Sequence, residues 1–568
     1  MKNSDFSYLL GLNYYGHDAS ASLLKNGKVI ASAMEERFSG VKKDRSFPIN
    51  AINFCLKYEG ISIDDIEVVT FYMDPELFHD QMVIHYLGRN YPKSIPLFEP
   101  LLDRSLKYKS VEKDIRDKLN FYKKIFFCNH HNAHIALSFF LSDFKEAAVI
   151  SIDGAGEITS TVLAVVQDNS IEVLREVDYP NSIGMLYNSL TYYLGFNPIS
   201  DQGKVMGLSA YGDSSKYIDK FREIVKLNDD GTFKMDLDYF EFQHKRNTWI
   251  SEKFLNTFGP RRSSDKEIEK KHKDIAAALQ RRVEEIFFHM GKYLKENTNM
   301  KHLCLSGGVT LNSVANGKLL QKEYFEDIFI PPPTGDDGTS IGAPLYYNYC
   351  VLKNTKRFPF VNPFLGPEYN ENEILKTIKR FNLKYQKSDN IFKETAELLS
   401  ENKIISWYQG RMEIGPRALG NRSIIANPAL HNVKELLNSR VKFRESFRPF
   451  APSILAEDVK DWFEYDHPAP FMLFVFKIKQ EKREKIPGVT HVDGTGWLQS
   501  VNKEFNERYY NLISEFKKIT GIPMVINTSF NIMGNPIVES PSDAIKCFLG
   551  NGIDYLVLGD YLIKKESY

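Results

Sequence analysis

The stretch from Gly410 to Ser453 has the highest density of side chains that can do chemistry. It reads GRMEIGPRALGNRSIIANPALHNVKELLNSRVKFRESFRPFAPS. Its cations are Arg411, Arg417, Arg422, Lys434, Arg440, Lys442, Arg444 and Arg448, against the acids Glu413, Glu435 and Glu445. They lie among Gly, Pro, Phe, Ala and Leu, which form tight turns and buried surface, so we expect several guanidinium groups in a cleft. Cations in such a place need anions as partners.

Two explanations of this basic stretch remain open at this point. Planar Arg forks beside a Lys charge suit a multiply charged phosphate ligand, because Arg fixes the geometry and Lys supplies a compact charge. Alternatively, the arginines form a structural network with the chain's own carboxylates. The Gly and Pro residues around Arg417 and Arg448 favour a backbone shaped around a ligand.

Histidines and aspartates form a second group of candidates. In CNHHNAHIALSFFLS, His130 and His134 stand four residues apart, so on a helix both rings lie on one face and can bind one metal ion, whereas His131 points away. Such a pair can also be a coincidence on a helix surface, and carboxylates from elsewhere in the chain would decide. Asp153 closes the strand VISID and Asp336 lies in the loop PPPTGDDGTSIG, both where parallel strands end and such sheets bind ligands.

The stretch QGKVMGLSAYG is a Gly-punctuated loop that contains a single lysine, and two further stretches suit a phosphate. In KHLCLSGGVTLNSVANGKLL a strand, a Gly-Gly turn and a helix follow one another; the amides at such a helix start can hold a phosphate or a ribose, or the turn is only a tight connection. Strand MVIN runs into a Thr-Ser pair that can bind a phosphate or form an ordinary loop. The candidates for nucleotide contacts are Lys204, Gly307, Gly308, Asn312, Gly335, Arg422, Asn527 and Thr528.

The elements that must position these residues predict an α/β protein with an internal duplication. Strand YLLGLNY, a polar turn, strand SASLLK, an Asn-Gly turn and strand KVIASAMEERF follow one another, and Asn-Gly between apolar runs is a strong hairpin signal. The same order returns from residue 147, with an Asp-Asn turn. Residues 267–297 have apolar side chains every three to four positions, which predicts an amphipathic core helix.

Domain organisation follows from length and from a change in composition. The chain of 568 residues is long enough for two or more domains with cores. Periodicity is lost from about residue 353, where Pro, Asn and Lys become frequent. We therefore expect a first domain at residues 1–355, a linker region at 356–387 and a second domain at 388–568.

Composition excludes several classes of protein. Lys plus Arg and Asp plus Glu number 73 each, so no global field attracts nucleic acid or an anionic membrane, and the local basic stretch needs a small anion. No apolar run approaches the roughly 20 residues of a membrane span, and the N-terminus lacks the features of a signal peptide. The cysteines are scattered without a CxxC pair. We expect a reduced, cytoplasmic protein, monomer or homodimer, that binds neither a nucleic acid polymer nor a membrane.

A series of motifs gives the chain a resemblance to a known family. They are HDASASLL, EERFSGVKKDRSFP, HHNAH, GKVMGLSAYG, SGGVTLNSVANG, GDDGTSIGA, GRMEIGPRALGNRS, KFRESFRPFAP, HVDGTG and NTSFN, in that order. Over nearly its whole length the chain resembles the O-carbamoyltransferases typified by the nodulation protein of rhizobia and by antibiotic carbamoyltransferases of the tobramycin and cephamycin pathways. The resemblance implies an N-terminal actin-like domain (ASKHA, Kae1/TsaD-like) of two ribonuclease-H-like halves and a C-terminal YrdC-like α/β domain.

The resemblance also implies a first reaction step in the C-terminal domain. Carbamoyl phosphate and ATP, the latter with Mg²⁺, would give carbamoyl-adenylate, phosphate and pyrophosphate. Coupling the carbamoyl group to AMP supplies a better leaving group, and cations stabilise the charge on the phosphates. The residues that match the family's positions for binding these anions are Arg417, Lys442, Arg448 and Ser529.

A second step would follow in the N-terminal domain. A hydroxyl of a small-molecule acceptor, such as a natural product, a sugar or a nucleoside, would attack the carbamoyl carbon and release AMP. The matching metal ligands are His130, His134, Asp153 and Asp336, for Fe²⁺ or another divalent ion. His17 in GHDAS is a candidate for handling the hydroxyl's proton, with a structural hydrogen-bonding role as the alternative.

One position departs from the family pattern and leaves alternatives open. The family normally has an Arg two residues after HVDGT that joins the phosphate grip, and this chain has Trp497. Another cation substitutes, or carbamoyl phosphate binds weakly, or the first substrate differs. The alternatives to the carbamoyltransferase are thus an adenylate-forming transferase with another donor or an amine acceptor, or a degenerate nucleotide-binding partner protein. The acceptor pocket is expected in variable loops such as 75–125 and 213–265.

Overall fold

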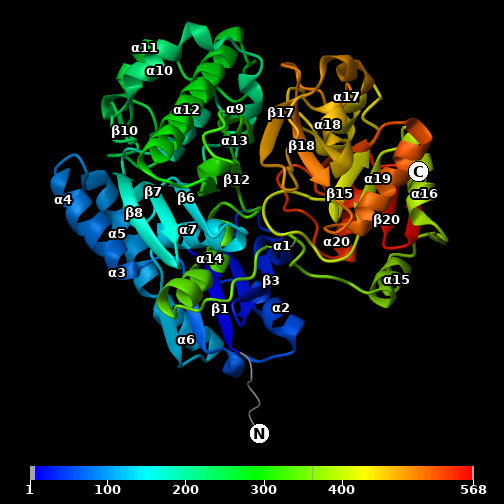
Figure 1. The fold of residues 1–568 in the computed structure, drawn as a ribbon, viewed down its shortest axis with the longest axis horizontal. Helices are drawn as coiled ribbons and strands as arrows, with labels where there is room; N and C mark the ends of the chain where they lie inside the picture. Colours follow the sequence, from blue (N-terminus) through cyan, green and yellow to red (C-terminus); the bar gives the residue numbers. More distant parts are fainter. Residues whose placement is uncertain (1–6, 361, 566–568) are drawn as a thin grey trace. The chain divides into compact units, whose positions relative to one another are not determined.

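The N-terminal part of the chain is built on two five-stranded sheets whose strands follow the same order (Figure 1). The computed structural model describes residues 7–360 and 362–565. The sheets have the orders β3-β2-β1-β4-β5 and β8-β7-β6-β11-β12. In each, the first three strands along the chain pair antiparallel and the last two add in parallel. The mixed α/β class and the internal duplication predicted from the sequence are confirmed.

In each sheet, hairpins connect the first three strands and helical crossovers lead to the last two. Those of the first sheet are β1 Tyr8–Asn13, β2 Ser20–Lys25, β3 Lys28–Met34, β4 Val68–Phe71 and β5 Lys124–Phe127. Those of the second sheet are β6 Glu146–Ile152, β7 Thr159–Gln167, β8 Ser170–Asp178, β11 His302–Ser306 and β12 Asp327–Phe329. Both predicted hairpin turns are present, and both residues of each turn have positive φ: 50° and 83° at Asn26 and Gly27, and 49° and 59° at Asp168 and Asn169. This is the geometry that Asn and Gly accept at the lowest cost.

Helices connect and cover the strands of this part. They are α2 Ile49–Glu59, α3 Pro75–Phe78, the π-helix η2 His79–Tyr86, α4 Leu87–Arg89, α5 Ile95–Lys109, α6 Val111–Leu119, α7 His130–Leu141, α8 Ile183–Tyr193, α9 Gln202–Ser209, α10 Ile218–Ile224, α11 Glu252–Phe258, α12 Lys270–Asn297, α13 Ser313–Leu320 and α14 Thr339–Tyr346. The predicted helix at 267–297 is α12. The stretch QGKVMGLSAYG, predicted as a loop, begins instead with α9, because packing against α12 stabilises a helix despite its two glycines.

The C-terminal part is built on one mixed sheet of nine strands in the order β13-β21-β20-β14-β15-β19-β16-β18-β17. Its strands are β13 Gln386–Lys387, β14 Ile405–Tyr408, β15 Arg422–Ala426, β16 Ala451–Leu455, β17 Phe474–Lys477, β18 Thr495–Val501, β19 Met524–Ser529, β20 Tyr555–Leu558 and β21 Tyr561–Lys564. Its helices are α15 Glu371–Arg380, α16 Ile391–Ser400, α17 Val433–Leu436, the π-helix η8 Leu437–Lys442, α18 Val459–Trp462, α19 Glu507–Thr520 and α20 Pro541–Leu549. A core that includes Leu399, Trp407, Tyr509 and Phe516 joins α16 and α19 to the sheet.

The division into units differs from the expected domain boundaries. One compact unit comprises residues 1–35 and 45–360, and the other comprises residues 36–44 and 361–568. The helix α1 Glu36–Ser39 therefore belongs to the second unit, although it directly follows β3. The expected linker at 356–387 contains α15 and β13, which fold as parts of the second unit.

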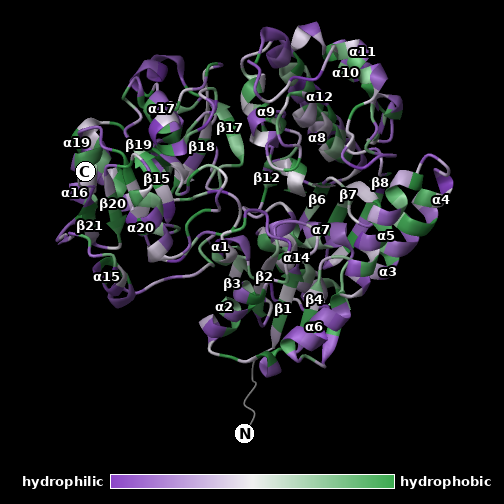
Figure 2. Cartoon of the chain, turned by 180° about the vertical axis from the view of Figure 1, so that it is seen from behind, coloured by the Kyte–Doolittle hydropathy of each residue, from purple (hydrophilic) through white to green (hydrophobic). Residues whose placement is uncertain are grey.

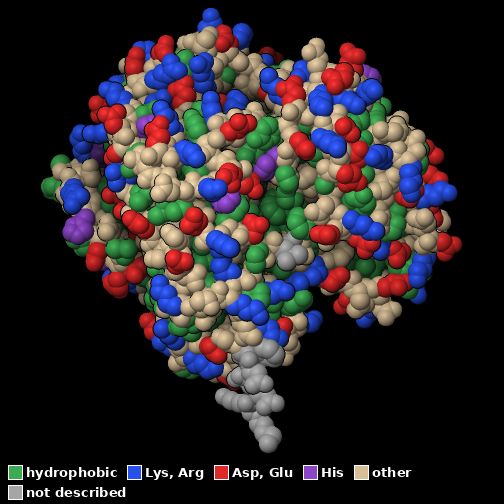
Figure 3. Space-filling model, viewed as in Figure 1, with side chains coloured by type: hydrophobic (Ala, Val, Ile, Leu, Met, Phe, Trp, Pro, Cys, Tyr) green, Lys and Arg blue, Asp and Glu red, His purple; other side chains and the backbone are tan. Residues whose placement is uncertain are grey.

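Polarity follows the layers of each unit. In Figure 2 the central strands are mainly coloured hydrophobic, whereas the helix α6 carries both hydrophilic and hydrophobic residues, of which Val111, Ile115 and Leu119 are buried. On the face drawn in Figure 3, acidic and basic side chains are interspersed, as the balance of 73 cations and 73 anions suggests. Among the described residues no helix combines the length and the apolarity that crossing a membrane requires.

Candidate metal centre and candidate anion site

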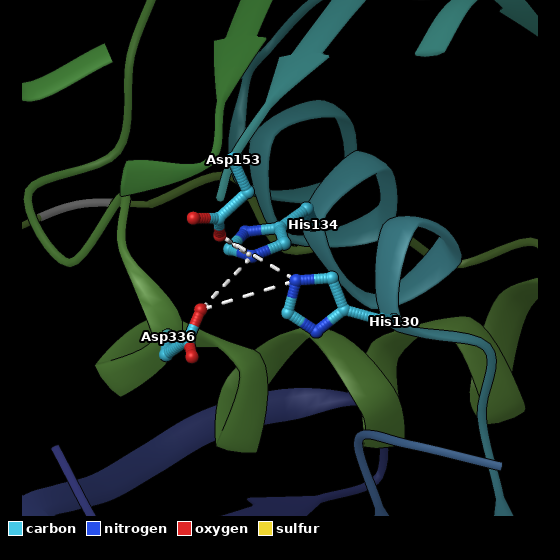
Figure 4. A group of neighbouring side chains, drawn as sticks. All are labelled: His130, His134, Asp153 and Asp336. Atoms are coloured by element: carbon cyan, nitrogen blue, oxygen red, sulfur yellow. Dashed lines mark ion pairs between the residues drawn. The ribbon is translucent and has the colours of Figure 1, made fainter. Parts of the chain in front are cut away.

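Four buried side chains converge at one point in the first unit. His130 and His134 lie one turn apart on α7, Asp153 follows the end of β6, and Asp336 begins the short turn before α14 (Figure 4). One ligand atom from each residue lies within 4.8 Å of the other three. The fold therefore brings together the complete set of predicted metal-ligand candidates.

The four side chains lie close enough together to influence one another's charge. His134 Nε2 lies 3.1 Å from Asp153 Oδ2 and 3.5 Å from Asp336 Oδ1, and His130 Nε2 lies 3.5 and 3.9 Å from the same atoms. Burial opposes protonation of His134, but its interactions with the two nearby aspartate carboxylates outweigh burial and raise its pKa to about 9. Burial opposes ionisation of Asp153, yet the two imidazoles hold its pKa well below the ordinary value.

The unsatisfied polar atoms of this group fit a divalent metal ion. Both ring nitrogens of His130 and His134, Asp153 Oδ2 and Asp336 Oδ1 are buried without a hydrogen-bond partner in the described residues. Leaving such atoms unpaired costs free energy, which coordination to one cation would recover. Two imidazoles and two carboxylates suit Fe²⁺, Mn²⁺ or Zn²⁺.

Neighbouring residues fix the start of α7. Glu157 accepts hydrogen bonds from His130 N at 3.0 and 3.2 Å, from Asn129 Nδ2 at 3.0 Å and from Asp74 N at 2.9 Å. His131 points away from the group, as expected: Nδ1 lies 2.8 Å from Ser151 Oγ and Nε2 lies 2.9 Å from Thr159 O. Burial lowers the pKa of His131 to about 3, so this ring is a neutral structural group.

The predicted Gly-Gly turn adjoins the metal group. Gly307 has φ of 93°, and a Cβ there would lie 2.1 Å from Ile152 O, so only glycine fits. A Cβ on Gly308 would lie 3.2 Å from Asp153 Oδ1. The turn after β11 therefore lies directly against a candidate metal ligand.

The other predicted nucleotide contacts in this unit have partners within the fold. Lys204 lies on α9, with Nζ 3.1 Å from Asp201 Oδ2. Asn312 caps α13 and donates to Gln280 Oε1 at 2.9 Å. Gly335 immediately precedes Asp336, and a Cβ there would lie 3.2 Å from Asp337 Oδ1. A nucleotide would have to share or replace these contacts.

His17 lies beside the metal group. Its Nε2 is 3.5 Å from Asp336 Oδ2, the oxygen that does not face the histidines, and its Nδ1 is 2.8 Å from Asp18 Oδ2. The side chain is 37% exposed, so one edge of the ring remains accessible to a ligand. The position is compatible with the predicted proton-handling role and with a structural hydrogen bond.

The second unit holds a separate cluster of cations around Lys442. Lys442 is buried at the end of η8, and its Nζ donates to Ser529 O at 2.6 Å, Ser529 Oγ at 3.2 Å, Asn531 O at 3.2 Å and Asn531 Oδ1 at 2.8 Å. Burial, together with the charges of Arg444 and Arg448, holds its pKa well below the ordinary value. Lys442 and Ser529 are thus neighbours, as predicted.

The cluster has too little negative charge of its own. Burial and Arg448 lower the pKa of Arg417 to about 10 and that of Arg444 to about 9. Among the described residues, neither arginine nor Lys442 forms an ion pair, and Arg417 Nε is buried without a hydrogen-bond partner. Arg448 lies 4.0 Å from Glu445. Arg417, Arg444 and Lys442 are therefore candidates for binding an anion.

Sequence reasoning missed one member of this cluster. Lys42 belongs to the segment 36–44, which is part of the second unit, and its charge interacts with that of Arg448. Burial, followed by the opposing effects of Glu36 and Arg37, lowers the pKa of Lys42. The two lysines of EERFSGVKKDRSFP could have indicated an anion site, but no local sequence pattern relates that stretch to residues beyond 361.

Arg422 was predicted as a nucleotide contact, and the structure gives it a different place. It is fully buried in β15 and donates to the carbonyl oxygens of Gln409 at 2.6 Å, Gly410 at 3.1 Å and Pro367 at 3.3 Å. Its guanidinium lies 3.6 Å from the centroid of the Tyr408 ring. This arginine stabilises the fold, because its hydrogen-bond donors are used by backbone carbonyls.

The end of β19, at residues 527–529, holds one residue that belongs to the scaffold and one that contacts Lys442. Asn527 Nδ2 donates to Ala418 O at 3.1 Å and to Gln499 Oε1 at 2.9 Å, which makes it part of the scaffold. Thr528 and Ser529 are half-buried at the end of β19. Only Ser529 of these residues contacts Lys442.

Trp497, the departure from the expected pattern, contacts the cluster directly. The guanidinium of Arg417 lies 4.1 Å from the centroid of the indole, and the indole Nε1 donates to Met472 O at 2.6 Å. The indole thus adds no charge but fixes the orientation of an existing guanidinium. This contact could not be read from the sequence, because 80 positions separate the partners along the chain.

Family models match most of the chain. Residues 8–345 match the model described as carbamoyltransferase N-terminus, and residues 396–565 match the model described as carbamoyltransferase C-terminus. An uncharacterized protein of Synechocystis is 38% identical, over 99% of this chain and 97% of its own length. The nodulation protein NolNO of Sinorhizobium fredii is 36% identical, over 98% of this chain and 80% of its own. Nodulation protein NolO of Bradyrhizobium diazoefficiens is 38% identical, over 77% and 79%.

Solved structures show only distant similarity. The HypF protein of T. kodakarensis covers 61% of this chain and 48% of its own, with 14% identity and a TM-score of 0.32. Component A of the 2-hydroxyglutaryl-CoA dehydratase of Acidaminococcus fermentans covers 61% of this chain and 99% of its own, with 16% identity and a TM-score of 0.32.

Proposed function

Because this chain belongs to the carbamoyltransferase family, we propose that its two sites catalyse consecutive steps of ATP-dependent carbamoyl transfer to a small-molecule hydroxyl. The first unit is proposed to be an actin-like (Kae1-like) domain, which its duplicated strand order supports. The second is proposed to be a YrdC-like domain.

The proposed first step takes place at the cation cluster of the second unit. Water cleaves carbamoyl phosphate to carbamate and phosphate, and a carbamate oxygen attacks the α-phosphorus of ATP, so that carbamoyl-adenylate and pyrophosphate result. Lys442, Arg417, Arg444 and Arg448 would stabilise the negative charge of the phosphates. Ser529, which already contacts Lys442 Nζ, would add a hydroxyl donor to the same anion.

The proposed second step takes place at His130, His134, Asp153 and Asp336. These residues would hold a divalent ion, which when bound supplies a Lewis acid beside the adenylate. The acceptor oxygen forms a bond to the carbamoyl carbon, the bond from that carbon to the AMP oxygen breaks, and the acceptor proton leaves to a base. His17 Nε2 is positioned near the group for that proton, and the amides of the Gly307-Gly308 turn would bind the AMP phosphate.

One observation carries the proposal. The same chain holds a metal-ligand set with buried, unsatisfied atoms and, in the other unit, a cation cluster with little negative charge of its own. A protein that only forms an adenylate would not need the metal-ligand set. A protein that only binds a nucleotide would not need both the metal-ligand set and the cation cluster.

A product analysis tests the proposal. Purified full-length protein with ATP and carbamoyl phosphate should release pyrophosphate and phosphate, and AMP should appear once an acceptor is present. His130→Ala should retain pyrophosphate release and lose metal and transfer. His131→Asn, in the same helix but outside the group, is the matched control and should retain both.

Two results would contradict the proposal. One is ATP turnover that is independent of carbamoyl phosphate. The other is full carbamoyl transfer, with metal retained, in His130→Ala. Binding of ATP without any turnover would instead favour a nucleotide-binding partner protein.

A further inference from the structure

The helical segment between β4 and β5 brings one arginine close to the candidate metal centre. Arg104 lies on α5, and its side chain folds back so that Nη2 and Nε donate to Tyr108 Oη at 3.0 and 3.4 Å. The guanidinium also lies 5.2 and 5.4 Å from the ring centroids of Phe78 and Tyr108. Two rings and two hydrogen bonds therefore hold the guanidinium in one orientation.

Two buried tyrosines connect Arg104 to the metal ligands. Tyr108 Oη and Tyr72 Oη lie 3.3 Å apart, and the Tyr72 ring packs edge-on against the His130 ring with 5.6 Å between centroids. The backbone at Gly16, next to His17, lies so close that a Cβ there would be 2.3 Å from Tyr72 Oη. Tyr108 and Tyr72 therefore lie between Arg104 and the His130 ring, and the charge of Arg104 interacts with that of Asp336.

Arg104 has no ion-pair partner among the described residues of the first unit. Among the described residues no carboxylate lies within ion-pair distance of its guanidinium, and its hydrogen bonds go to a neutral phenol. Arg116 of the neighbouring helix α6 is instead paired with Glu112 at 2.5 Å. Arg104 is exposed while Tyr72, Tyr108 and Phe78 beneath it are buried, so its free N–H groups are accessible to a ligand.

Resting on the proposed carbamoyl transfer, we propose that Arg104, held in place by Tyr108 and Tyr72, binds an oxyanion of the acceptor. The acceptor is then a small hydroxylated molecule that also carries a carboxylate or a phosphate. A guanidinium fork donates parallel N–H bonds to either group, and the two buried tyrosines hold the fork in place. The two tyrosines between Arg104 and His130 set the spacing between the anionic group and the reacting hydroxyl.

Binding of matched sugars to the full-length protein tests this proposal. Isothermal titration calorimetry at low salt compares glucose with glucuronate and glucose 6-phosphate, which share hydroxyls and differ in charge. The wild-type protein should bind at least one charged sugar at least about tenfold more tightly than glucose, since a hydrogen bond to a charged group is worth roughly ten- to a hundredfold in affinity. Whichever charged sugar binds more tightly identifies the carboxylate or the phosphate as the group of the acceptor.

Variants of α5 locate the effect. Arg104→Gln should lose the preference for the charged sugars and leave glucose unchanged, and Arg104→Lys should restore part of it. Lys107→Gln, on the same helix and paired outward with Asp103 at 2.8 Å, removes an equal charge and should behave like the wild type. Thermal unfolding of each variant shows whether it is folded.

Several outcomes would overturn the proposal. One is equal affinity of the wild-type protein for charged and uncharged sugars, or no binding of any of them. Another is a loss of the preference for charged sugars in Lys107→Gln that equals the loss in Arg104→Gln. A weaker affinity of Arg104→Gln for AMP alone would assign the guanidinium to the nucleotide. Pyrophosphate release from ATP and carbamoyl phosphate, measured on the same samples, does not involve Arg104, so its absence would count against the proposed function and its presence would confine a failure to the acceptor subsite.

Discussion

Replacement of Lys442 by Met is the most direct test of the cation cluster. The Lys442 side chain is 4% exposed, and within residues 7–360 and 362–565 its Nζ donates only to oxygens of Ser529 and Asn531. Without a ligand, the ammonium group suffers from burial and from the charges of Arg444 and Arg448, which together hold its pKa well below the ordinary value. Met keeps the length and apolar volume of the stem and removes the charge and the donors.

The expected effect can be estimated from these contacts. A hydrogen bond from a charged donor contributes about 1.5 to 3 kcal/mol, which is roughly ten- to a hundredfold in the affinity for a phosphate ligand. In the free protein, relief from the buried charge opposes the loss of the hydrogen bonds to Ser529 and Asn531. We therefore expect the affinity to fall much more than the stability of the free protein.

Isothermal titration with pyrophosphate and with carbamoyl phosphate measures this affinity. Lys565→Met is the matched control, because Lys565 also lies in the second unit and donates to the carbonyl oxygens of Phe548 and Leu549 at 2.9 and 3.1 Å. Lys442→Met should bind both anions about ten- to a hundredfold more weakly, and the control should bind as the wild type does. Supplied carbamoyl-adenylate should still be used by Lys442→Met.

Two results would refute the reasoning. An affinity of Lys442→Met within about twofold of the wild type would mean that Lys442 does not contact the anion, since twofold is far below the value of one charged hydrogen bond. Equal loss of adenylate formation and of transfer from supplied carbamoyl-adenylate would contradict two separate sites.

Three other predictions concern the surroundings of the two sites. Glu157→Gln should lower the metal affinity by about ten- to a hundredfold, because an amide cannot accept all the hydrogen bonds at the start of α7; competition with a chelator measures this, and unchanged affinity would contradict it. Trp497→Ala should weaken carbamoyl phosphate binding by about three- to tenfold by releasing Arg417, as titration would show. Burial raises the pKa of Glu539 from 4.5 to about 7. The contribution of Glu539 to the free energy of unfolding is therefore complete below pH 4.5 and is lost as the pH rises through 7. The free energy of unfolding should therefore fall by up to about 3 kcal/mol over that range relative to Glu539→Gln, and parallel pH profiles of the two proteins in denaturant would refute this.

Much of the fold could be predicted because the signals are local. The hairpin turns at Asn26-Gly27 and Asp168-Asn169 depend on residues that accept positive φ. The spacing of His130 and His134 depends only on the helical repeat, and their partners Asp153 and Asp336 stand at strand ends, where sheets bind ligands.

The failures occurred where distant residues decide. Packing against α12 makes α9 a helix although its two glycines favour a loop. Arg422 belongs to the same basic stretch as Arg417, but carbonyl oxygens from Gln409 and Pro367 surround it, and the sequence does not show which arginine of the stretch they will reach. Lys42 is separated by more than three hundred positions from the cations that it joins.

The assignment of residues 36–44 limits how this chain can be divided. A gene fragment that begins at residue 361 would encode a protein without Lys42 and without Arg37, whose guanidinium donates to Gly415 O at 3.0 Å. Exchange of C-terminal halves between homologues would likewise pair a foreign sheet with the original 36–44 strip, unless the strip is transferred as well. The two halves of the chain are therefore not independent when they are exchanged between homologues. Engineering of donor specificity has to transfer the segment 36–44 together with the C-terminal half.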